Sequence, residues 1–277
     1  MKKLPFQDQV AIITGASRGI GRAAALELAR QGADLCLASR DAIGMSETAR
    51  LVQEYRREAL TVQTDVSSQP QVERMVSQAI QRWGRVDVLV SNSGIYVRSP
   101  IASLDVSTLE RSMATNFYGH VHCVLAVLPH MLERRRGHIV LVSSFDGKKA
   151  MPGDSPYAAA KFALNGFGEA LRQELSPQGI FTTLIMPGRV DTDFIYDLKV
   201  PRIQPPIPPE NVARAITRGI LKRKAEVILP PQVLLMHAVN SIHPRLGDLA
   251  VRLFHLQGWE LEGAVLDDHH HPTSSIT

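Results

Sequence analysis

Three polar residues in the middle of the chain are of the types that could together reduce a carbonyl group. Tyr157 precedes Lys161 by four positions, and Ser144 lies thirteen positions before the tyrosine. A phenol can give a proton to a carbonyl oxygen if its pKa, about 10 when unperturbed, is drawn toward neutrality. An ammonium group one helical turn away favours phenolate, and a serine hydroxyl can polarise the carbonyl. We therefore expect Tyr157 to be the general acid/base, Lys161 its electrostatic partner and Ser144 the carbonyl stabiliser.

A second pattern, near the N-terminus, has the features of a dinucleotide-binding turn. The segment Thr14-Gly-Ala-Ser-Arg-Gly-Ile-Gly21 joins an apolar run to an amphipathic one. Its three glycines differ in spacing from the GxGxxG fingerprint, but they suit the same tasks: a tight turn, close approach of the backbone to a pyrophosphate, and close packing of a helix. The helix that begins near Ile20 would direct its free N–H groups toward the phosphates.

The residues after the second apolar run favour NADP(H) over NAD(H). An NAD site usually has an acidic residue there, which accepts hydrogen bonds from the ribose 2′-hydroxyl. This chain has Ser39 and Arg40 instead, and Arg18 lies in the glycine turn. Two guanidinium groups suit a 2′-phosphate, which a carboxylate would repel. The alternative is that Asp41 is the ribose acid through a slip in register; we prefer Asp41 as the N-cap of the next helix.

These motifs lie between elements whose order predicts the fold. Short apolar runs alternate with longer amphipathic ones over the first two-thirds of the chain. Such an alternation implies a parallel sheet covered on both faces, which is a doubly wound α/β fold of about seven strands. The expected strands are 10–14, 34–38, 60–64, 86–90, 138–142, 181–185 and 227–229. The expected helices are 20–31, 42–57, 70–83, 104–133, 155–175 and 209–221.

Composition excludes several other classes of protein. The 277 residues carry 31 Lys+Arg against 27 Asp+Glu, a net charge of +4 that is too small for a nucleic-acid binder. The two cysteines, Cys36 and Cys123, lie in apolar runs, so we expect small buried residues in a reducing compartment. The N-terminal residues lack the apolar segment of a signal peptide, and no apolar run is long enough to span a bilayer. We expect a cytoplasmic protein.

Taken together, the motifs resemble those of the short-chain dehydrogenase/reductase family over roughly residues 6–230. The family's glycine motif corresponds to the turn described above, its catalytic Tyr-x-x-x-Lys to Tyr157 and Lys161, and its fourth catalytic position to Asn116. The further matching segments are Asp65-Val66 for the adenine contact, Ser91-Asn-Ser-Gly94 after the fourth strand, and Pro187-Gly-Arg-Val-Asp-Thr192 for the nicotinamide carboxamide. The family has Asn where this chain has Ser91, which puts in doubt the sheet-stabilising hydrogen bonds of that position.

The resemblance implies a Rossmann-type fold and an oxidoreductase that transfers hydride between NADP(H) and a ketone, an aldehyde or a secondary alcohol. Asn116 would hold a water that links Lys161 to solvent and so resupplies the proton. The family also implies a small-molecule substrate and a homo-oligomer, either a dimer or a tetramer. The expected cofactor-binding residues are Gly15, Ser17, Arg18, Gly19, Ile20, Gly21, Ser39, Arg40, Asp65, Val66, Asn92, Ser93, Gly94, Tyr157, Lys161, Pro187, Gly188, Val190 and Thr192.

Other interpretations stay open at this point. Tyr-x-x-x-Lys arises by chance on amphipathic helices, Ser144 could cap a strand, and Asn116 could bond to a helix backbone. An NAD-dependent alcohol or hydroxysteroid-type dehydrogenase is the alternative enzyme, and a regulator that binds NADP(H) without turnover is the alternative outside catalysis.

The C-terminal part of the chain is expected to be an appendage. We expect a catalytic domain over residues 1–230 and a helical extension with a polar tail over 231–277. The apolar residues of the extension would cover the core or a neighbouring subunit, and membrane contact is the less favoured alternative. We expect no metal site, including at the run His269–His271 in the polar tail.

In the family, two loops build the substrate pocket: residues 145–156 here, and the loop after Pro187. The charged residues of the first loop are expected to face solvent in preference to binding substrate; they are Asp146, Lys148, Lys149 and Asp154. In the second loop, the proline-rich segment 201–209 is expected to form a lid.

Overall fold

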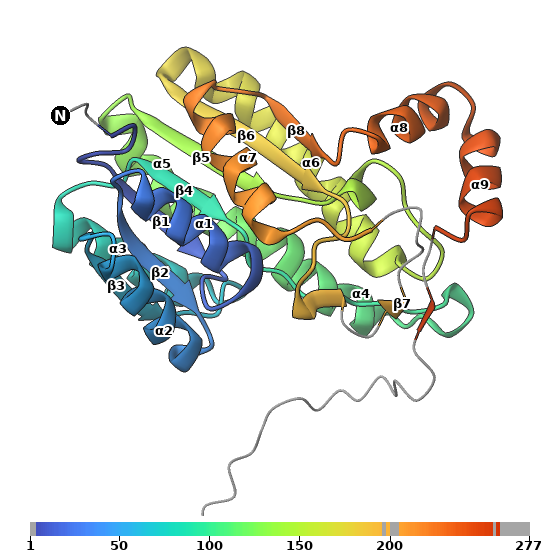
Figure 1. The fold of residues 1–277 in the computed structure, drawn as a ribbon, viewed down its shortest axis with the longest axis horizontal. Helices are drawn as coiled ribbons and strands as arrows, with labels where there is room; N and C mark the ends of the chain where they lie inside the picture. The colour runs from blue at the N-terminus through green and yellow to red at the C-terminus, as the bar shows by residue number, and fades with distance from the viewer. Residues whose placement is uncertain (1–3, 196–197, 200–204, 257–258, 261–277) are drawn as a thin grey trace, which may run out of the picture.

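A seven-stranded parallel sheet forms the centre of the molecule (Figure 1). The computed structural model describes residues 4–195, 198–199, 205–256 and 259–260. The strand order is β3-β2-β1-β4-β5-β6-β8, and every neighbouring pair is parallel. The doubly wound, Rossmann-type fold is therefore confirmed. The strands are β1 (Val10–Thr14), β2 (Asp34–Ser39), β3 (Ala59–Gln63), β4 (Val88–Ser91), β5 (Gly137–Val142), β6 (Ile180–Pro187) and β8 (Glu226–Leu229).

Helices cover both faces of this sheet, because strands buried on two sides present apolar side chains to each. One face packs against α1, α2 and α7, and the other against α3, α5 and α6. Figure 1 shows α1 and α7 side by side over the first face. Their bounds are α1 (Gly19–Arg30), α2 (Ala42–Gln53), α3 (Gln69–Trp83), α4 (Val106–Met113), α5 (Gly119–Glu133), α6 (Ser155–Leu175) and α7 (Pro209–Leu221). Cys36 and Cys123 are buried in the second of these layers, as expected.

The order of the strands reverses between β1 and β4. From β1 the chain proceeds outward to β2 and β3, and then returns to β4 on the opposite side of β1. Loops that leave the carboxyl ends of β1 and β4 diverge, and the crevice between them is where such folds bind ligands. Thr14 fixes the two strand ends to each other, because its Oγ1 accepts hydrogen bonds from the N–H groups of Asn92 (2.9 Å) and Ser93 (3.1 Å).

Two of the expected helices are wrong in their extent. The expected helix over 104–133 is divided, because α4 ends at Met113, a π-helical turn spans Ala114–Tyr118, and α5 follows. A π-helical turn is a single-turn insertion inside a helix, and the helical pattern resumes after it, so the pattern over 104–133 predicts one continuous helix. The expected helix over 42–57 ends at Gln53, and Arg56 adopts a positive φ of 57° beyond that end.

Asp87 connects three parts of the structure at the amino-terminal edge of the sheet. Its carboxylate accepts hydrogen bonds from the N–H of Val10 (3.0 Å), from Arg85 (2.7 and 2.6 Å) and from Arg134 (3.1 Å), and its side chain is 3% exposed. Burial raises the pKa of this carboxyl, but the hydrogen bonds from Arg85, Val10 and Arg134 more than offset that effect and leave the pKa lowered. A lowered pKa in the folded state means that ionised Asp87 stabilises the fold.

We expect the substitution Asp87→Asn to lower the free energy of unfolding by about 3 kcal/mol at neutral pH, because it leaves a buried set of donors without its charge. The contribution of Asp87 is present above the pKa of the unfolded state, about 4, and is lost as pH falls through the lower folded value. Urea unfolding between pH 7 and pH 3 should therefore show a smaller loss of stability in acid for the variant. The control is Glu54→Gln, whose exposed pair with Arg50 should change stability by less than about 0.5 kcal/mol. Equal effects of the two substitutions would contradict this account.

The helical extension packs against the loop that follows β5. It contains α8 (Val233–Ile242) and α9 (Pro244–Leu253), which project beside the sheet in Figure 1. Val251 and Leu256 bury their side chains against Phe145 and Met151, Lys149 forms an ion pair with Asp248, and Arg189 donates to the carbonyl of Leu256. The extension therefore helps to fix two loops of the catalytic part, although the division at residue 230 stays a prediction.

The extension also presents an exposed apolar stripe on α9, formed by Leu246, Leu249 and Leu253. Nothing in the structure shows what covers this stripe, so subunit packing and membrane contact both stay predictions. No helix in the described part of the chain is long and apolar enough to cross a membrane. Residues 201–204 of the expected lid and the run His269–His271 lie outside the described residues.

Candidate functional site

A cavity of about 490 Å³ runs along the carboxyl edge of the sheet, at the crevice between β1 and β4. Its wall combines the glycine turn, the ends of β4, β5 and β6, and the start of α6. The expected residues on this wall are Gly15, Ser17, Arg18, Gly19, Ile20, Asn92, Ser93, Gly94, Ser144, Tyr157, Lys161, Pro187, Gly188, Val190 and Thr192. Segments that are far apart in the sequence thus meet around one space whose volume is within the usual range of ligand pockets.

A smaller cavity adjoins the glycine turn at the ends of β2 and β3. Ser39, Arg40, Asp65 and Val66 line it, together with Gly15. These four are the expected residues for the adenosine ribose and the adenine. Two other expected residues, Gly21 and Asn116, line neither cavity. Gly21 packs against the carbonyl of Gly15, and Asn116 forms hydrogen bonds with Ile95 after β4.

The glycine turn has the shape that a bound pyrophosphate requires. Gly15 has a φ of +65°, and a Cβ built on it would lie 2.8 Å from Nδ2 of Asn92. A Cβ built on Gly21 would collide with the carbonyl of Gly15. Among the described residues no side chain caps the start of α1, and its first turn contains no acidic residue. The free N–H groups and positive end of this helix therefore fit an anionic pyrophosphate.

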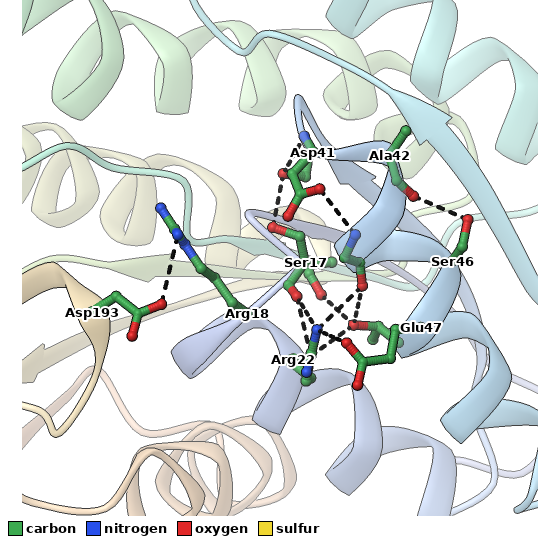
Figure 2. Close-up of polar contacts among 12 residues, drawn as sticks. Ser17, Arg18, Arg22, Asp41, Ala42, Ser46, Glu47 and Asp193 are labelled. Atoms are coloured by element: carbon green, nitrogen blue, oxygen red, sulfur yellow. Dashed lines mark hydrogen bonds and ion pairs between the residues drawn. The ribbon is translucent and has the colours of Figure 1, made fainter. Parts of the chain in front are cut away.

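Arg22, which sequence reasoning did not single out, holds the turn in place (Figure 2). Its guanidinium donates to the carbonyl of Ser17 (3.1 and 2.6 Å) and to Glu47 (2.8 Å), and Nε also donates to Oγ1 of Thr48 (3.1 Å). Arg22 lies one position beyond the last glycine, so only the contacts with α2 reveal its role.

The arginines expected at the cofactor are both exposed and flank the turn. Figure 2 shows Arg18 pointing away from Arg22 toward Asp193, whose carboxylate lies 3.6 Å from it. Arg40 lies 4.0 Å from the carboxylate of Asp65 across the smaller cavity. Exposed pairs of this kind hold their partners weakly, so both guanidinium groups can turn toward a phosphate.

Asp41 is the N-cap of α2, as the sequence predicts. Its Oδ1 accepts a hydrogen bond from the N–H of Gly44 at 2.9 Å. The Oγ of Ser39 lies at the strand end itself, where it donates to Oγ of Ser17 (3.1 Å) and accepts from the N–H of Asp41 (3.3 Å). The end of β2 therefore holds a hydroxyl, and the carboxylate of Asp41 caps α2.

The three residues expected to act on a carbonyl converge on the large cavity. α6 begins at Ser155 and places Tyr157 and Lys161 on one face, with Nζ of Lys161 5.6 Å from the centre of the Tyr157 ring. Nζ also donates to the carbonyl of Val142 at 3.1 Å, where β5 ends. Ser144 lies two positions beyond that strand end and lines the same cavity as Tyr157. The geometry is that of a proton donor, a nearby cation and a hydroxyl that share one face of the cavity.

The charges around this group determine its protonation in the empty cavity. Burial raises the pKa of Tyr157 and the carboxyl of Asp146 adds to that effect, while the hydrogen bond from Ser144 opposes it. Burial lowers the pKa of Lys161 to about 7. The phenol is therefore protonated at neutral pH, which is the form that donates a proton to a carbonyl oxygen, and an anionic ligand nearby would favour the charged lysine.

Asn116 is fully buried in the π-helical turn and its amide is hydrogen-bonded within the protein. Oδ1 accepts from the N–H of Ile95 (3.0 Å), and Nδ2 donates to the carbonyl of Ile95 (2.9 Å) and to Oγ of Ser112 (3.1 Å). The amide thus fixes the segment after β4 against α4. A water at this residue would bind its backbone or the second lone pair of Oδ1, since both of the amide's N–H groups are used within the protein.

The expectation that the charged residues of the loop after β5 face solvent is wrong for Asp154 and Lys149. Asp154 is 1% exposed, because it accepts hydrogen bonds from Tyr96 (3.0 Å) and from Nε of Arg98 (2.7 Å). Lys149 is 9% exposed through its pair with the extension. Asp146, Asp154 and Arg189 all lie on the wall of the large cavity.

Two aromatic residues that sequence reasoning missed complete the wall near Tyr157. The ring of Tyr96 lies 5.2 Å from that of Tyr157, edge to face, and the ring of Phe194 lies 5.6 Å from that of Tyr96. Tyr96 follows Gly94 at the end of β4, so its place after a strand end was the available signal. Phe194 lies in a short 3₁₀ turn with no distinctive pattern.

We expect Gly21→Ala to weaken both the fold and cofactor binding, because its Cβ has no space behind the turn. Overpacking of this kind costs about 1–3 kcal/mol, and displacement of the Gly15 carbonyl would distort the pyrophosphate site. Urea unfolding and fluorescence titration with NADPH measure the two effects. The control is Gly166→Ala on α6, an exposed position where no described atom lies within 4 Å of the new Cβ, and which should gain up to about 1 kcal/mol. A variant at Gly21 that keeps wild-type stability and affinity would contradict the prediction.

The chain is similar in sequence and in structure to known proteins. The family model described as short chain dehydrogenase matches residues 9–200. An uncharacterized oxidoreductase of Listeria monocytogenes is 36% identical over 194 residues, which cover 69% of this chain and 78% of that protein. The structure of levodione reductase has a TM-score of 0.75 at 27% identity, over 81% of this chain and 96% of that one. An alcohol dehydrogenase of the archaeon Thermococcus sibiricus, solved with 5-hydroxy-NADP, has a TM-score of 0.73 at 28% identity, over 80% and 95%.

Proposed function

The chain belongs to the short-chain dehydrogenase/reductase family of oxidoreductases, and on that premise we propose that it transfers a hydride between NADP(H) and a ketone, an aldehyde or a secondary alcohol. The observation that carries the proposal is the meeting of Ser144, Tyr157 and Lys161 on the wall of one cavity with the glycine turn. A regulator without turnover would have no use for a protonated phenol beside a carbonyl-binding hydroxyl.

The residues of the chain handle the substrate oxygen and its proton, while the bound cofactor supplies or accepts the hydride. Ser144 donates a hydrogen bond to the substrate carbonyl and so positions it against Tyr157. Tyr157 gives its proton to the oxygen as the carbonyl is reduced, and takes it back in the oxidation. Lys161, which lies 5.6 Å from the phenol ring, stabilises the phenolate that forms.

NADP(H) is the proposed cofactor because of the groups around the smaller cavity. Arg40 lines it, and the end of β2 offers the hydroxyl of Ser39 where an NAD site would offer a carboxylate. Arg18 lies in the adjoining glycine turn, on the wall of the large cavity. The related Thermococcus sibiricus enzyme was solved with an NADP derivative. An NAD-dependent enzyme is the second candidate, because the carboxylate of Asp65 also lines this cavity.

The proposal is tested by turnover. The full-length chain is assayed with NADPH and with NADH against a panel of aldehydes and ketones, with cofactor oxidation followed by absorbance. We expect turnover with a higher kcat/KM for NADPH. Failure to reduce any member of the panel, with NADPH binding intact, would favour the regulator.

A further inference from the structure

Asp146 is an acidic residue on the wall of the substrate end of the cavity, two positions after Ser144. Its Oδ2 accepts a hydrogen bond from Oγ of Ser144 at 3.3 Å. The backbone N–H of Asp146 donates to Oγ of Ser144 at 3.0 Å. Its second carboxyl oxygen, Oδ1, makes no hydrogen bond with any residue in the described part of the chain. Because Asp146 lines the cavity, this oxygen is available to accept a hydrogen bond from a ligand beside Ser144.

The charged groups around Asp146 are engaged elsewhere. Asp154 accepts hydrogen bonds from Arg98 and Tyr96, and Arg189 donates to the carbonyl of Leu256 in the extension. Burial, with the nearby charge of Asp154 adding to it, raises the pKa of Asp146 to about 7, while Arg189 opposes the shift. Burial therefore favours the neutral form of this carboxyl, which lies on the cavity wall beside Ser144.

We propose that Asp146 is a specificity-determining residue, which accepts a hydrogen bond from a hydroxyl group on the carbon next to the reacting carbonyl. The proposal rests on the proposed function and names its substrate class as hydroxy ketones and hydroxy aldehydes, or the corresponding diols in the oxidation.

The position of Asp146 relative to Ser144 supports this substrate class. Oγ of Ser144 lies 3.3 Å from Oδ2 of Asp146. A carbonyl oxygen that is hydrogen-bonded to Oγ of Ser144 is therefore also close to the carboxyl of Asp146. A hydroxyl on the adjacent carbon lies about one hydrogen-bond length, 2.8 Å, from that carbonyl oxygen. When Ser144 turns its single O–H from Asp146 to the substrate carbonyl, the carboxyl of Asp146 is left to accept a hydrogen bond from the substrate hydroxyl.

The charge balance of the wall favours a hydroxyl over an ammonium group as the donor. Asp146 and Asp154 are matched by Arg98 and Arg189, so a cationic substrate would add an unbalanced charge to a partly buried site. A hydroxyl adds none, and it can hydrogen-bond to the carboxyl in either protonation state.

The experiment compares three substrates of equal chain length: a methyl ketone, its 1-hydroxy derivative and its 1-amino derivative. We expect the wild-type protein with NADPH to prefer the hydroxy ketone over the methyl ketone by at least tenfold in kcat/KM, mainly through KM, and to prefer it over the amino ketone as well. In Asp146→Ala this preference should fall to within about threefold, because the acceptor is lost. The control is Asp248→Asn, which alters the ion pair of Lys149 outside the cavity and should keep the wild-type ratio.

The ratio separates this role from a general disturbance of Ser144. Loss of activity on all three substrates with an unchanged ratio would overturn the proposal and leave Asp146 as a support for Ser144. A wild-type ratio near one, or a preference for the amino ketone, would also overturn it while the proposed function stands. Absence of turnover on every ketone would contradict the proposed function itself, and the subsite with it.

Discussion

Tyr157→Phe should reduce the kcat of carbonyl reduction by about 10³-fold, which is within the range that a positioned acid contributes. The substitution removes the phenolic hydroxyl group and leaves the rest of the side chain unchanged. Its ring should stay in place, because it packs against Tyr96 at 5.2 Å and Phe194 at 6.0 Å through contacts that do not involve the hydroxyl.

Affinity for the cofactor should be nearly unchanged in this variant, because the glycine turn and Arg22 are remote from the phenol. Fluorescence titration with NADPH measures the affinity, and the initial rate with a saturating ketone measures the chemistry. Tyr55→Phe, at an exposed position beyond α2, is the control and should leave both quantities unchanged. A Tyr157→Phe protein with the wild-type rate would refute the assignment of the acid.

Ser39→Asp should reverse the preference for the cofactor. It places a carboxylate at the end of β2, beside the cavity that Arg40 lines, where it can accept from a ribose diol and repel a 2′-phosphate. A pair of unit charges about 4 Å apart near a protein surface interacts by about 4 kcal/mol, so the ratio of kcat/KM for NADPH to that for NADH should fall at least about 100-fold.

Ser39→Asn is the matched control, because it has the size of aspartate without the charge. It loses the same hydrogen bond to Ser17 and should shift the ratio by less than about fivefold. If the two variants shift the ratio equally, the effect is steric and the electrostatic account of the site is wrong. The ratio is measured for each variant with one ketone at low concentration, so that substrate binding cancels.

Much of the fold and of the site could be predicted because the relevant signals are local. Apolar runs such as Val10–Thr14 mark strands buried on both faces, and glycines at fixed offsets mark the turn that follows. The four-residue step from Tyr157 to Lys161 places both on one helix face wherever that helix packs. The N-cap role of Asp41 was equally local, since the bond spans only three residues.

The features that sequence reasoning missed depend on partners far away in the chain. Asp154 is buried because Arg98 and Tyr96, more than fifty residues earlier, supply the donors that compensate it. Asn116 turns inward because a π-helical turn aims it at Ile95, and a helix with that one extra residue has the same apolar periodicity on either side.

The sequence by itself determined which residues could donate a proton and which could bind a dinucleotide and its phosphates, because residue type and short spacing specify these roles. The tertiary structure decided what surrounds them: the raised pKa of Tyr157, the commitment of the Asn116 amide to the protein, and the carboxyl of Asp146 beside Ser144. Burial and electrostatics sum over all neighbours in space, and a linear pattern does not contain that sum.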